Sequence, residues 1–438
     1  MRTTQRNTPS TRSPRARLAS ALLVAILLGT LGGCGKGGDS APAPAPAPPP
    51  PTHEVPEATA EQAAAYATSQ VVQAVKLEAL PTEAEGLAAA LDKAPAVTMQ
   101  AYRQRTVKLM DRDVNAALEK LGPRPVQVRA LYDANALLVA ATWDDPSVEQ
   151  LADGESTHFG DAAALELPQS FGPGQSLPYV GMGDETHPVL VTIVRAHATE
   201  PYARQFVAAG FGSLTRIEAN TEMALRYDES AHRWTATWKR PLKDANVDLA
   251  KGLVPFALAL WDGSVRERGG NKAVTRWHLL RLADFPQDDA YLRHVAWGQT
   301  GEPVGDAARG KTLVTACTAC HRMGEVETAQ EGFAPGLDNI GGYALPQYLR
   351  ESILEPNAVV IRQVNINRHY DKKAGRNPHG AYPKNTTFQW YSDGGHGADA
   401  KPRVSKMPSF AHLPEQDVRD IVAYLQTFHR AVAPGSQP

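Results

Sequence analysis

The residues best suited to chemistry in this sequence are two cysteines and the histidine that follows them, in the pattern Cys317-Thr318-Ala319-Cys320-His321. Two thiols separated by two residues on one helical turn can both bond to one planar ligand, while the adjacent imidazole can bind a metal ion. This C-x-x-C-H spacing is the attachment signature of c-type haem. It predicts a covalent haem c at Cys317 and Cys320, with His321 as an axial ligand of the iron.

Two other interpretations of the cysteine pair are a thioredoxin-like dithiol and half of a zinc site. A thioredoxin-like dithiol follows a strand in a βαβ pattern, whereas this pair follows Gly310 to Val314, a predicted helix start. A zinc site needs two more ligands, and the sequence contains no second cysteine pair. Haem c is therefore preferred over both.

The surrounding segments resemble a class I cytochrome c over residues 303–432. Gly310-Lys311 opens the predicted attachment helix, and the loop 333–341 contains Pro335 where the family places the proline that positions the proximal histidine. Residues 348–356 are similar to the family's middle helix. Residues 417–428, with apolar side chains at helical spacing, look like the last helix packed on the first. The resemblance implies an all-α haem domain.

Met407 stands in Lys406-Met407-Pro408-Ser409-Phe410, which is similar to the loop that presents the distal methionine in this family. The resemblance therefore implies Met407 as the sixth ligand, which completes the coordination of the iron and favours electron transfer over catalysis. One departure from the family is an insertion at about 362–403. Three histidines in this insertion are competing ligand candidates: His369, His379 and His396. The preferred interpretation of the insertion is nevertheless a polar surface loop.

The region before the cytochrome domain is predicted to be mainly β. Residues 126–133 alternate apolar and polar side chains, turn at Asp133-Ala134-Asn135 and return through residues 137–143, a pattern typical of a β-hairpin. Further short strands are predicted at 189–196, 233–238, 254–261 and 274–282, separated by Gly, Pro and Asp. The fold class is therefore a multidomain chain, with an N-terminal β-sandwich followed by the all-α cytochrome c domain.

Landmarks within residues 95–290 resemble the haem-b-binding γ subunits of ethylbenzene dehydrogenase and dimethyl sulfide dehydrogenase. They include Thr142 to Pro146, Leu165 to Pro168, Pro178 to Gly183 and Ala259 to Lys272. In that family a methionine and a lysine hold haem b, and the matching residues here are Met182 and Lys272. His187 is a lesser ligand candidate. A lysine ligates only when neutral, so burial and the metal must offset its ordinary pKa of about 10.4.

The first 33 residues contain five arginines and no acid. All five arginines precede the apolar run Leu18 to Leu31. This pattern predicts a signal peptide, since the run is too short to span a bilayer comfortably. Leu31-Gly32-Gly33-Cys34 resembles a lipobox, so Cys34 is expected to carry a lipid; the alternative is an ordinary signal peptide cut elsewhere. Residues 34–60 form a Pro/Ala-rich linker, and 61–94 a helical lead-in.

These observations predict an exported, lipid-anchored dihaem electron carrier, not an enzyme, on a membrane that faces the periplasm. Gly35, directly after Cys34, resembles the pattern sorted to the outer membrane. The resemblance implies redox partner proteins, including a molybdenum enzyme with an iron–sulfur subunit. The net charge of −2 argues against nucleic-acid binding. The main alternative is a monohaem cytochrome c with a cofactor-free, ligand-binding sandwich. A dihaem peroxidase is the weakest candidate, because it usually needs two C-x-x-C-H motifs.

Overall fold

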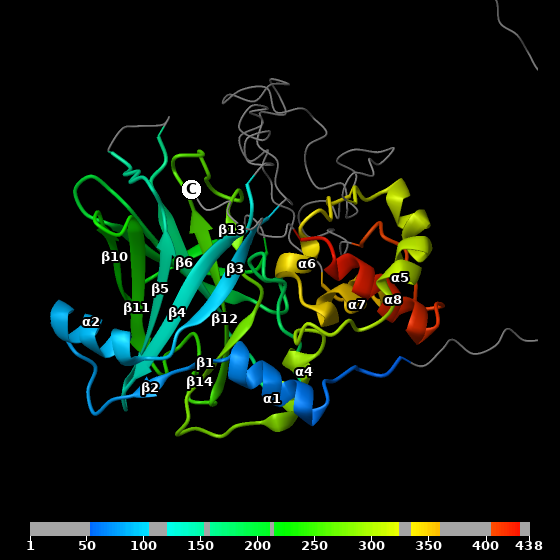
Figure 1. Cartoon of the computed structure of the whole chain (residues 1–438), viewed down its shortest axis with the longest axis horizontal. Helices are drawn as coiled ribbons and strands as arrows, with labels where there is room; N and C mark the ends of the chain where they lie inside the picture. The colour runs from blue at the N-terminus through cyan, green and yellow to red at the C-terminus, as the bar shows by residue number, and fades with distance from the viewer. Residues whose placement is uncertain are drawn as a thin grey trace, which may run out of the picture. The chain divides into compact units, whose positions relative to one another are not determined.

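The computed structural model describes residues 53–104, 121–152, 158–210, 214–323, 334–359 and 404–429 (Figure 1). The predicted signal peptide, Cys34 and the insertion at 362–403 lie outside these residues. Among the described residues, no helix is both long and apolar enough to cross a membrane.

The region 61–94, predicted as a helical lead-in, holds two helices with two short strands between them. Helix α1 spans Ala60–Ser69 and begins with a capping box between Thr59 and Gln62, while α2 spans Ala84–Lys93. Strand β1 (Val72–Gln73) pairs in parallel with β14 (His278–Arg281). Strand β2 (Val75–Lys76) pairs in parallel with β4 (Arg124–Tyr132). The lead-in is therefore joined to the sheet rather than separate from it.

Twelve further strands follow in the described chain. They are β3 (Val97–Arg103), β4 (Arg124–Tyr132), β5 (Ala136–Asp144), β6 (Ala162–Pro168), β7 (Val189–Arg195), β8 (Tyr202–Ala208), β9 (Thr215–Ile217), β10 (Glu222–Asp228), β11 (Arg233–Pro241), β12 (Leu253–Trp261), β13 (Ala273–Val274) and β14 (His278–Arg281). The predicted hairpin is present as β4 and β5. Its turn is held by Asp133, whose carboxylate accepts the N–H groups of Asn135 and Ala136, each at 2.8 Å.

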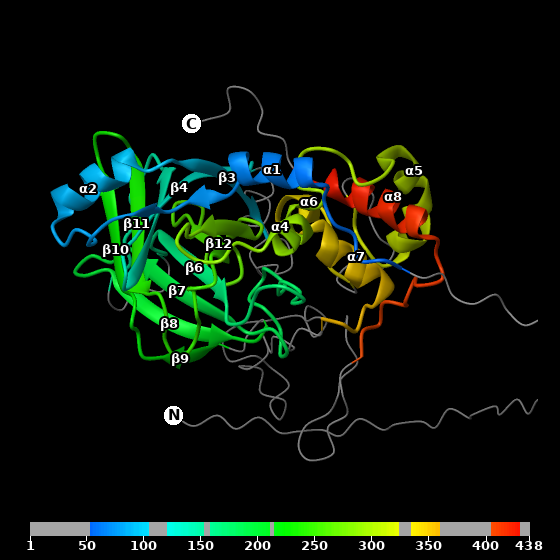
Figure 2. The ribbon, with the colours of Figure 1, turned by 90° about the horizontal axis from the view of Figure 1, so that it is seen from below.

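The strands form one curled sheet in the order β10-β11-β5-β4-β3-β13-β12-β6-β7-β8-β9 (Figure 2). Its two halves face each other across an apolar core, so the predicted sandwich is confirmed. The indole of Trp238 in β11 donates to the Thr192 carbonyl of β7 at 3.1 Å, which ties one layer to the other. The layers are nevertheless hydrogen-bonded into a single sheet, because the two-residue strand β13 joins β3 to β12.

Strands β6 and β12 are buried at every position, so both faces of this layer are covered. One face lies in the core of the sandwich. On the other face, Ala162, Ala164, Ala257 and Ala259 belong to an apolar cluster that also contains helical residues of the C-terminal region. Burial on both sides explains why these strands have continuous apolar runs instead of the alternation expected of a half-exposed strand.

The C-terminal region is all-α, as predicted. Its helices are α4 (Asp289–Ala296), α5 (Ala307–Leu313), a 3-10 turn η1 (Val314–Ala319), α6 (Ile340–Tyr343), α7 (Pro346–Leu354) and α8 (Glu415–Gln426). The attachment helix begins at Ala307, three residues before Gly310, because Asp306 caps it. Helix α8 packs on α5 at Gly310, where a Cβ atom would lie 1.9 Å from the Asp420 carbonyl oxygen. The predicted packing of the last helix on the first is confirmed.

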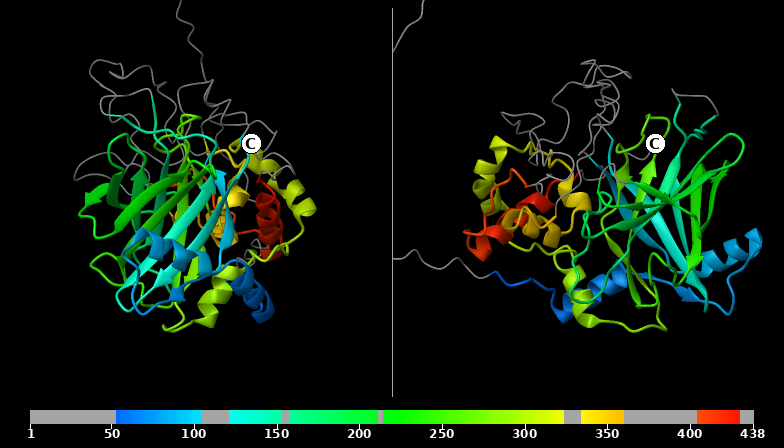
Figure 3. Two further views of the ribbon diagram at one scale, coloured as in Figure 1. Left: turned by 60° about the vertical axis from the view of Figure 1, so that its left-hand side comes forward. Right: turned by 180° about the vertical axis from the view of Figure 1, so that it is seen from behind.

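Helix α6 contacts the sandwich at β3 (Figure 3). Arg276, which follows β13, donates to the Gly341 carbonyl at 3.0 Å. The amide of Asn339 donates to the Arg103 carbonyl at 3.2 Å. Gly342 lies so close to Tyr102 that a Cβ atom would be 2.3 Å from its ring. The contact is therefore built from buried polar groups and a close backbone approach.

The buried carboxylate of Asp420 should make the stability of the protein depend on pH. Burial alone would raise the pKa of Asp420, but hydrogen bonds from the Asp306 N–H, Arg309 and Gln416 outweigh it and lower the pKa below its ordinary 3.8. A carboxyl with a depressed pKa in the folded state stabilises above its unfolded pKa and loses this effect as the pH falls. Asp420→Asn should therefore lower the free energy of unfolding at pH 7 by about 1–3 kcal/mol.

This difference between the parent and the variant should shrink as the pH falls below about 4, where the unfolded carboxyl becomes protonated. Denaturant unfolding of both proteins at several pH values, followed by the helical signal, measures it. A difference that stayed constant down to pH 3 would contradict the argument.

Candidate haem sites

The four residues predicted to hold haem c line one cavity of about 250 Å³: Cys317, Cys320, His321 and Met407. The rest of its wall is mostly apolar and comes from α7, α8 and the loop that follows η1. It includes Leu349, Ile353, Ile421 and Leu425. An apolar slot with two thiols, an imidazole and a thioether is the donor set that a covalently attached haem requires, so these residues fit the group.

The two cysteines are placed by the 3-10 turn η1. Cys317 lies within it, Cys320 caps its end, and the backbone N–H groups of Cys320 and His321 both donate to the Cys317 carbonyl, at 3.1 and 2.9 Å. Both thiols are free rather than joined in a disulfide. Burial raises the pKa of the Cys317 thiol. The turn thus holds both sulfur atoms and the imidazole on one wall of the cavity.

His321 is oriented by the loop that follows. Its Nδ1 lies 2.9 Å from the Pro335 carbonyl oxygen, so Nδ1–H donates and Nε2 is left as the ligating nitrogen. Burial lowers the pKa of His321, which favours the neutral imidazole that binds metal ions. The structure therefore gives Pro335 the positioning role that the sequence resemblance implied.

Met407 lies in a loop held against α7. The Ser409 hydroxyl donates to the Leu354 carbonyl at 2.5 Å, and the Phe410 N–H donates to the Ile353 carbonyl at 3.0 Å. The N–H of Met407 itself donates to the Ser405 hydroxyl at 3.1 Å. This loop brings a half-buried thioether to the cavity that contains His321. The competing histidines His369, His379 and His396 lie outside the described residues.

The second candidate site is on the buried outer face of β6 and β12. Met182 has a φ of +83°, a conformation that residues other than glycine rarely adopt. Its N–H donates to the Glu166 carboxylate, and its carbonyl accepts the Gly210 N–H at 2.8 Å. Strained backbone of this kind persists only where the surroundings hold it, and it clusters at functional positions.

Lys272 lies close to the same carboxylate. The side chain is buried, with 4% of the residue exposed, and Nζ is 5.8 Å from the centroid of the Trp261 ring. Burial lowers the pKa of Lys272, although the charge of Glu166 opposes the shift. Burial likewise raises the pKa of Glu166, and the charge of Lys272 opposes that shift. Met182 and Lys272 thus both interact with one buried acid, the first through a hydrogen bond and the second electrostatically.

The outer face of β6 and β12 carries several alanine side chains near Glu166. In the antiparallel pair of β6 and β12, Ala164 is opposite Ala259, and Glu166 is opposite Ala257. These alanines belong to a buried apolar cluster that also contains Trp261 of β12. A thioether, an amine and an apolar face are the kinds of group that hold a non-covalent haem.

His187, the lesser ligand candidate, has a side chain that is 37% exposed, and its Nδ1 lies 3.2 Å from the Asp184 carboxylate. It also contacts the Thr186 hydroxyl at 2.9 Å. More than a third of the His187 side chain is thus exposed, whereas Lys272 is buried, so His187 is less well placed to hold a non-covalent haem away from water.

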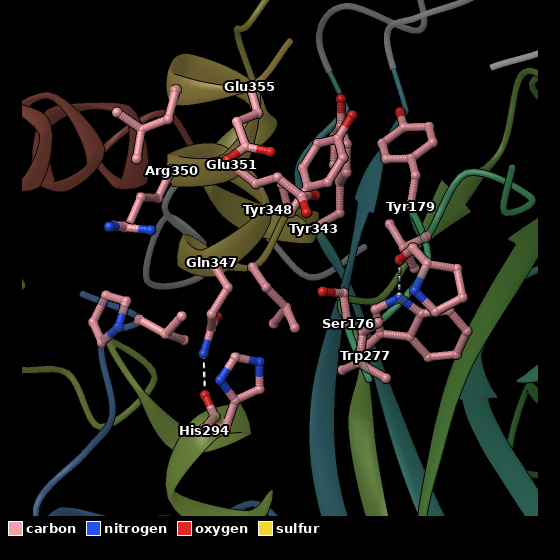
Figure 4. Close-up of a pocket in the computed structure, with 18 residues that line it drawn as sticks. Ser176, Tyr179, Trp277, His294, Tyr343, Gln347, Tyr348, Arg350, Glu351 and Glu355 are labelled. Atoms are coloured by element: carbon pink, nitrogen blue, oxygen red, sulfur yellow. Dashed lines mark hydrogen bonds between the residues drawn. The ribbon is translucent and has the colours of Figure 1, made fainter. Parts of the chain in front are cut away.

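A second cavity, of about 200 Å³, lies between the sandwich and the helical region (Figure 4). The rings of Tyr179 and Tyr348 stack with centroids 5.1 Å apart, and both residues line this cavity and the one that contains His321. Tyr179 stands three residues before Met182, and its carbonyl accepts the Gly183 N–H at 2.8 Å. The two candidate haem sites are therefore neighbours.

Sequence reasoning missed Glu166, the Tyr179–Tyr348 stack and the Arg276 contact. An acid inside an otherwise apolar strand was the available signal for Glu166.

Sequence reasoning also missed a group of three carboxylates whose oxygens lie within 4.8 Å of one another: Asp145, Asp161 and Asp262. Asp161 accepts N–H groups from Glu149, Gly263 and Trp234, which ties loops of both layers together.

Comparison with known proteins agrees with this division of the chain. Residues 307–429 match the Cytochrome c family. A protein named putative respiratory nitrate reductase heme subunit ORF7, from Haloferax mediterranei, is 28% identical over 181 residues, 40% of this chain and 62% of that protein. The chlorate reductase γ subunit of Ideonella dechloratans is 30% identical over 173 residues, 38% of this chain and 66% of that subunit.

The dimethylsulfide dehydrogenase γ subunit of Rhodovulum sulfidophilum is 28% identical over 155 residues, 33% of this chain and 55% of that subunit. The chain thus spans less than two thirds of each of these relatives. A carbohydrate-binding module of family 9 from Caldicellulosiruptor kristjanssonii, solved with glucose, has a TM-score of 0.26 and 10% identity, with coverage of 50% of this chain and 98% of that one. Residues 307–429 are therefore a cytochrome c domain, and the region before them is homologous to the haem and γ subunits of these oxidoreductases.

Proposed function

We propose that this protein is a dihaem electron carrier, with a covalent haem c at Cys317 and Cys320 and a non-covalent haem b at Met182 and Lys272. The observation that carries the proposal is the convergence of two thiols, an imidazole and a thioether on one apolar cavity within a cytochrome c domain.

The residues of the first site favour electron transfer over catalysis. His321 and Met407 would hold the iron of a haem bound in this cavity, and the chain would then leave no iron position for a substrate. A bound haem would supply one-electron chemistry between ferric and ferrous iron. The thioether of Met407 would favour the ferrous state of such a haem and raise its reduction potential, and the apolar wall from α7 and α8 would exclude water from the site.

Three observations support haem b in the sandwich. The relatives include a subunit named for haem, and two γ subunits, among them that of dimethylsulfide dehydrogenase. Met182 is held in a strained conformation beside buried Lys272. The adjoining sheet face is apolar, with Ala164, Ala257 and Ala259 in one buried cluster. The partner proposed from these relatives is an oxidoreductase complex with a molybdenum subunit and an iron–sulfur subunit, to which this chain contributes no catalytic residue.

A haem count tests the proposal directly. Pyridine haemochrome spectra of the purified protein should show one haem b and one haem c per chain. Haem c alone would favour the alternative, a monohaem cytochrome with a cofactor-free sandwich. A protein without covalent haem would overturn the function altogether.

We also propose that the chain is exported and held at the periplasmic side of a membrane by a lipid on Cys34. The support is the arginine-rich start, the short apolar run and the small residues before Cys34. Cys34→Ser should leave both haem sites intact but release the protein into the soluble fraction, since stable anchoring rests on the acyl chains. Membrane fractionation of cells that produce each form measures this, and a variant still retained on membranes would contradict the lipid anchor.

A further inference from the structure

Glu166 is a buried acid for which the proposed function has not yet given a role. It lies in β6 between Leu165 and Leu167, and only 6% of the residue is exposed. Removing a carboxylate from water is costly, so a chain that keeps one in an apolar strand must offset the cost with specific partners.

The partners of Glu166 are the two proposed haem b ligands. Its carboxylate accepts the backbone N–H of Met182, and the positive charge that acts on it is that of Lys272. The other carboxylate oxygen, Oε1, is buried and has no hydrogen-bond partner among the described residues. One side chain thus bonds to the backbone of Met182, interacts electrostatically with Lys272 and retains an unused acceptor.

The bond to Met182 acts where the backbone is strained. At φ +83°, the peptide of Met182 is held on one side by Glu166 and on the other by the Gly210 N–H. Loss of either bond would let the backbone relax and move the thioether away from the sheet face. The unused Oε1 suits the second ligand, because an amine bound to iron keeps two N–H bonds and can donate one of them.

We propose that Glu166 is the positioning residue of the haem b site, fixing the backbone of Met182 and accepting from the amine of Lys272 so that both donors face one iron. This inference rests on the proposed dihaem function. It differs from a purely structural role for Glu166, which would affect the stability of the sheet but not the ligation of a haem.

Three variants separate these roles. Glu166→Ala removes both the acceptor of the Met182 N–H and the charge that acts on Lys272. Glu166→Gln keeps an acceptor oxygen of the same reach for the Met182 N–H. Leu165→Ala is the matched control, because Leu165 is the neighbouring residue of β6 and points into the core between the layers. For each protein, acid extraction gives the haem b content per chain, the covalent haem serves as the internal standard, and spectra of ferric haem b report its ligands.

Glu166→Ala should retain haem b about 10–100-fold more weakly than the parent, as expected when an outer-sphere partner of a metal ligand is lost. Glu166→Gln should recover much of this retention with a changed ferric spectrum. Leu165→Ala should melt at a lower temperature yet keep the parental haem b content and spectrum. If Glu166→Ala does not fold, the spectrum of Glu166→Gln carries the test, and an unchanged spectrum overturns the inference.

Retention of haem b with the parental spectrum in Glu166→Ala would overturn the positioning role, as would an equal loss of haem b in Leu165→Ala. A parent protein without extractable haem would instead overturn the dihaem function, and this inference with it. If Met182→Ala loses haem b while Glu166→Ala keeps it, the function stands and only the role of Glu166 fails.

Discussion

Met182→Ala is expected to abolish the extractable haem of this protein while leaving the covalent haem at Cys317 and Cys320 in place. Haem b has no thioether tether, so its retention rests on two axial bonds and on burial of the ring. Removal of the thioether eliminates one of these bonds. Acid extraction followed by spectra of the extract and of the remaining protein measures both haems in one sample.

Lys272→Ala should have much the same effect, because it removes the opposite axial donor. Matched controls are Met223→Ala in β10 and Lys251→Ala. The ammonium group of Lys251 donates to the Phe171 carbonyl at 3.1 Å, away from the proposed ligands. Both controls should keep one extractable haem per chain. Full retention of haem b in Met182→Ala and Lys272→Ala would show that other residues bind it.

The residues of the haem c cavity were predictable because local sequence determines them. The C-x-x-C-H motif specifies two attachment points and one ligand within five residues, and Pro335 and Met407 stand in loops with recognisable neighbours. The hairpin of β4 and β5 was predictable for the same reason, since alternation and an Asp-x-Asn turn are both short-range signals.

Long-range pairing was not predictable in this way. Strand β13 contains two residues, too few to give a periodic signal, yet it closes the path from β3 to β12 and makes one sheet of the two layers. The predicted single strand at 274–282 is instead divided between β13 and β14. At Thr275 the side-chain hydroxyl, in place of the backbone carbonyl, accepts the Leu258 N–H of β12 at 3.0 Å, which interrupts the regular ladder.

The sequence indicates the contact between the sandwich and the cytochrome domain only weakly. The unbroken apolar run of β12 indicates a strand covered on both faces, but does not say by what. The cover includes Tyr343, Leu345 and Leu349 of the helical region, more than 80 residues further along the chain. Similarly, the positive φ of Met182 depends on Glu166 and Gly210, which come from separate strands and loops.

Met407→His is expected to lower the reduction potential of haem c by on the order of 100 mV or more, within the ~0.8 V range that axial ligands can span. A thioether favours ferrous iron, whereas a second imidazole stabilises ferric iron. The weak absorption at the red end of the spectrum that accompanies iron–sulfur ligation should also disappear. Redox titration of the intact protein in a Met182→Ala background, which should lack haem b, isolates the covalent haem.

Met323 provides the control for this substitution, because it is a buried methionine that lines the same cavity two residues after His321. Met323→Leu should keep both the potential and the red absorption, while Met407→Leu should lose the absorption and open one axial position to external ligands such as cyanide. An unchanged potential in Met407→His would mean that the sixth ligand comes from another segment, and the histidines at 369, 379 and 396 would then be the residues to replace next.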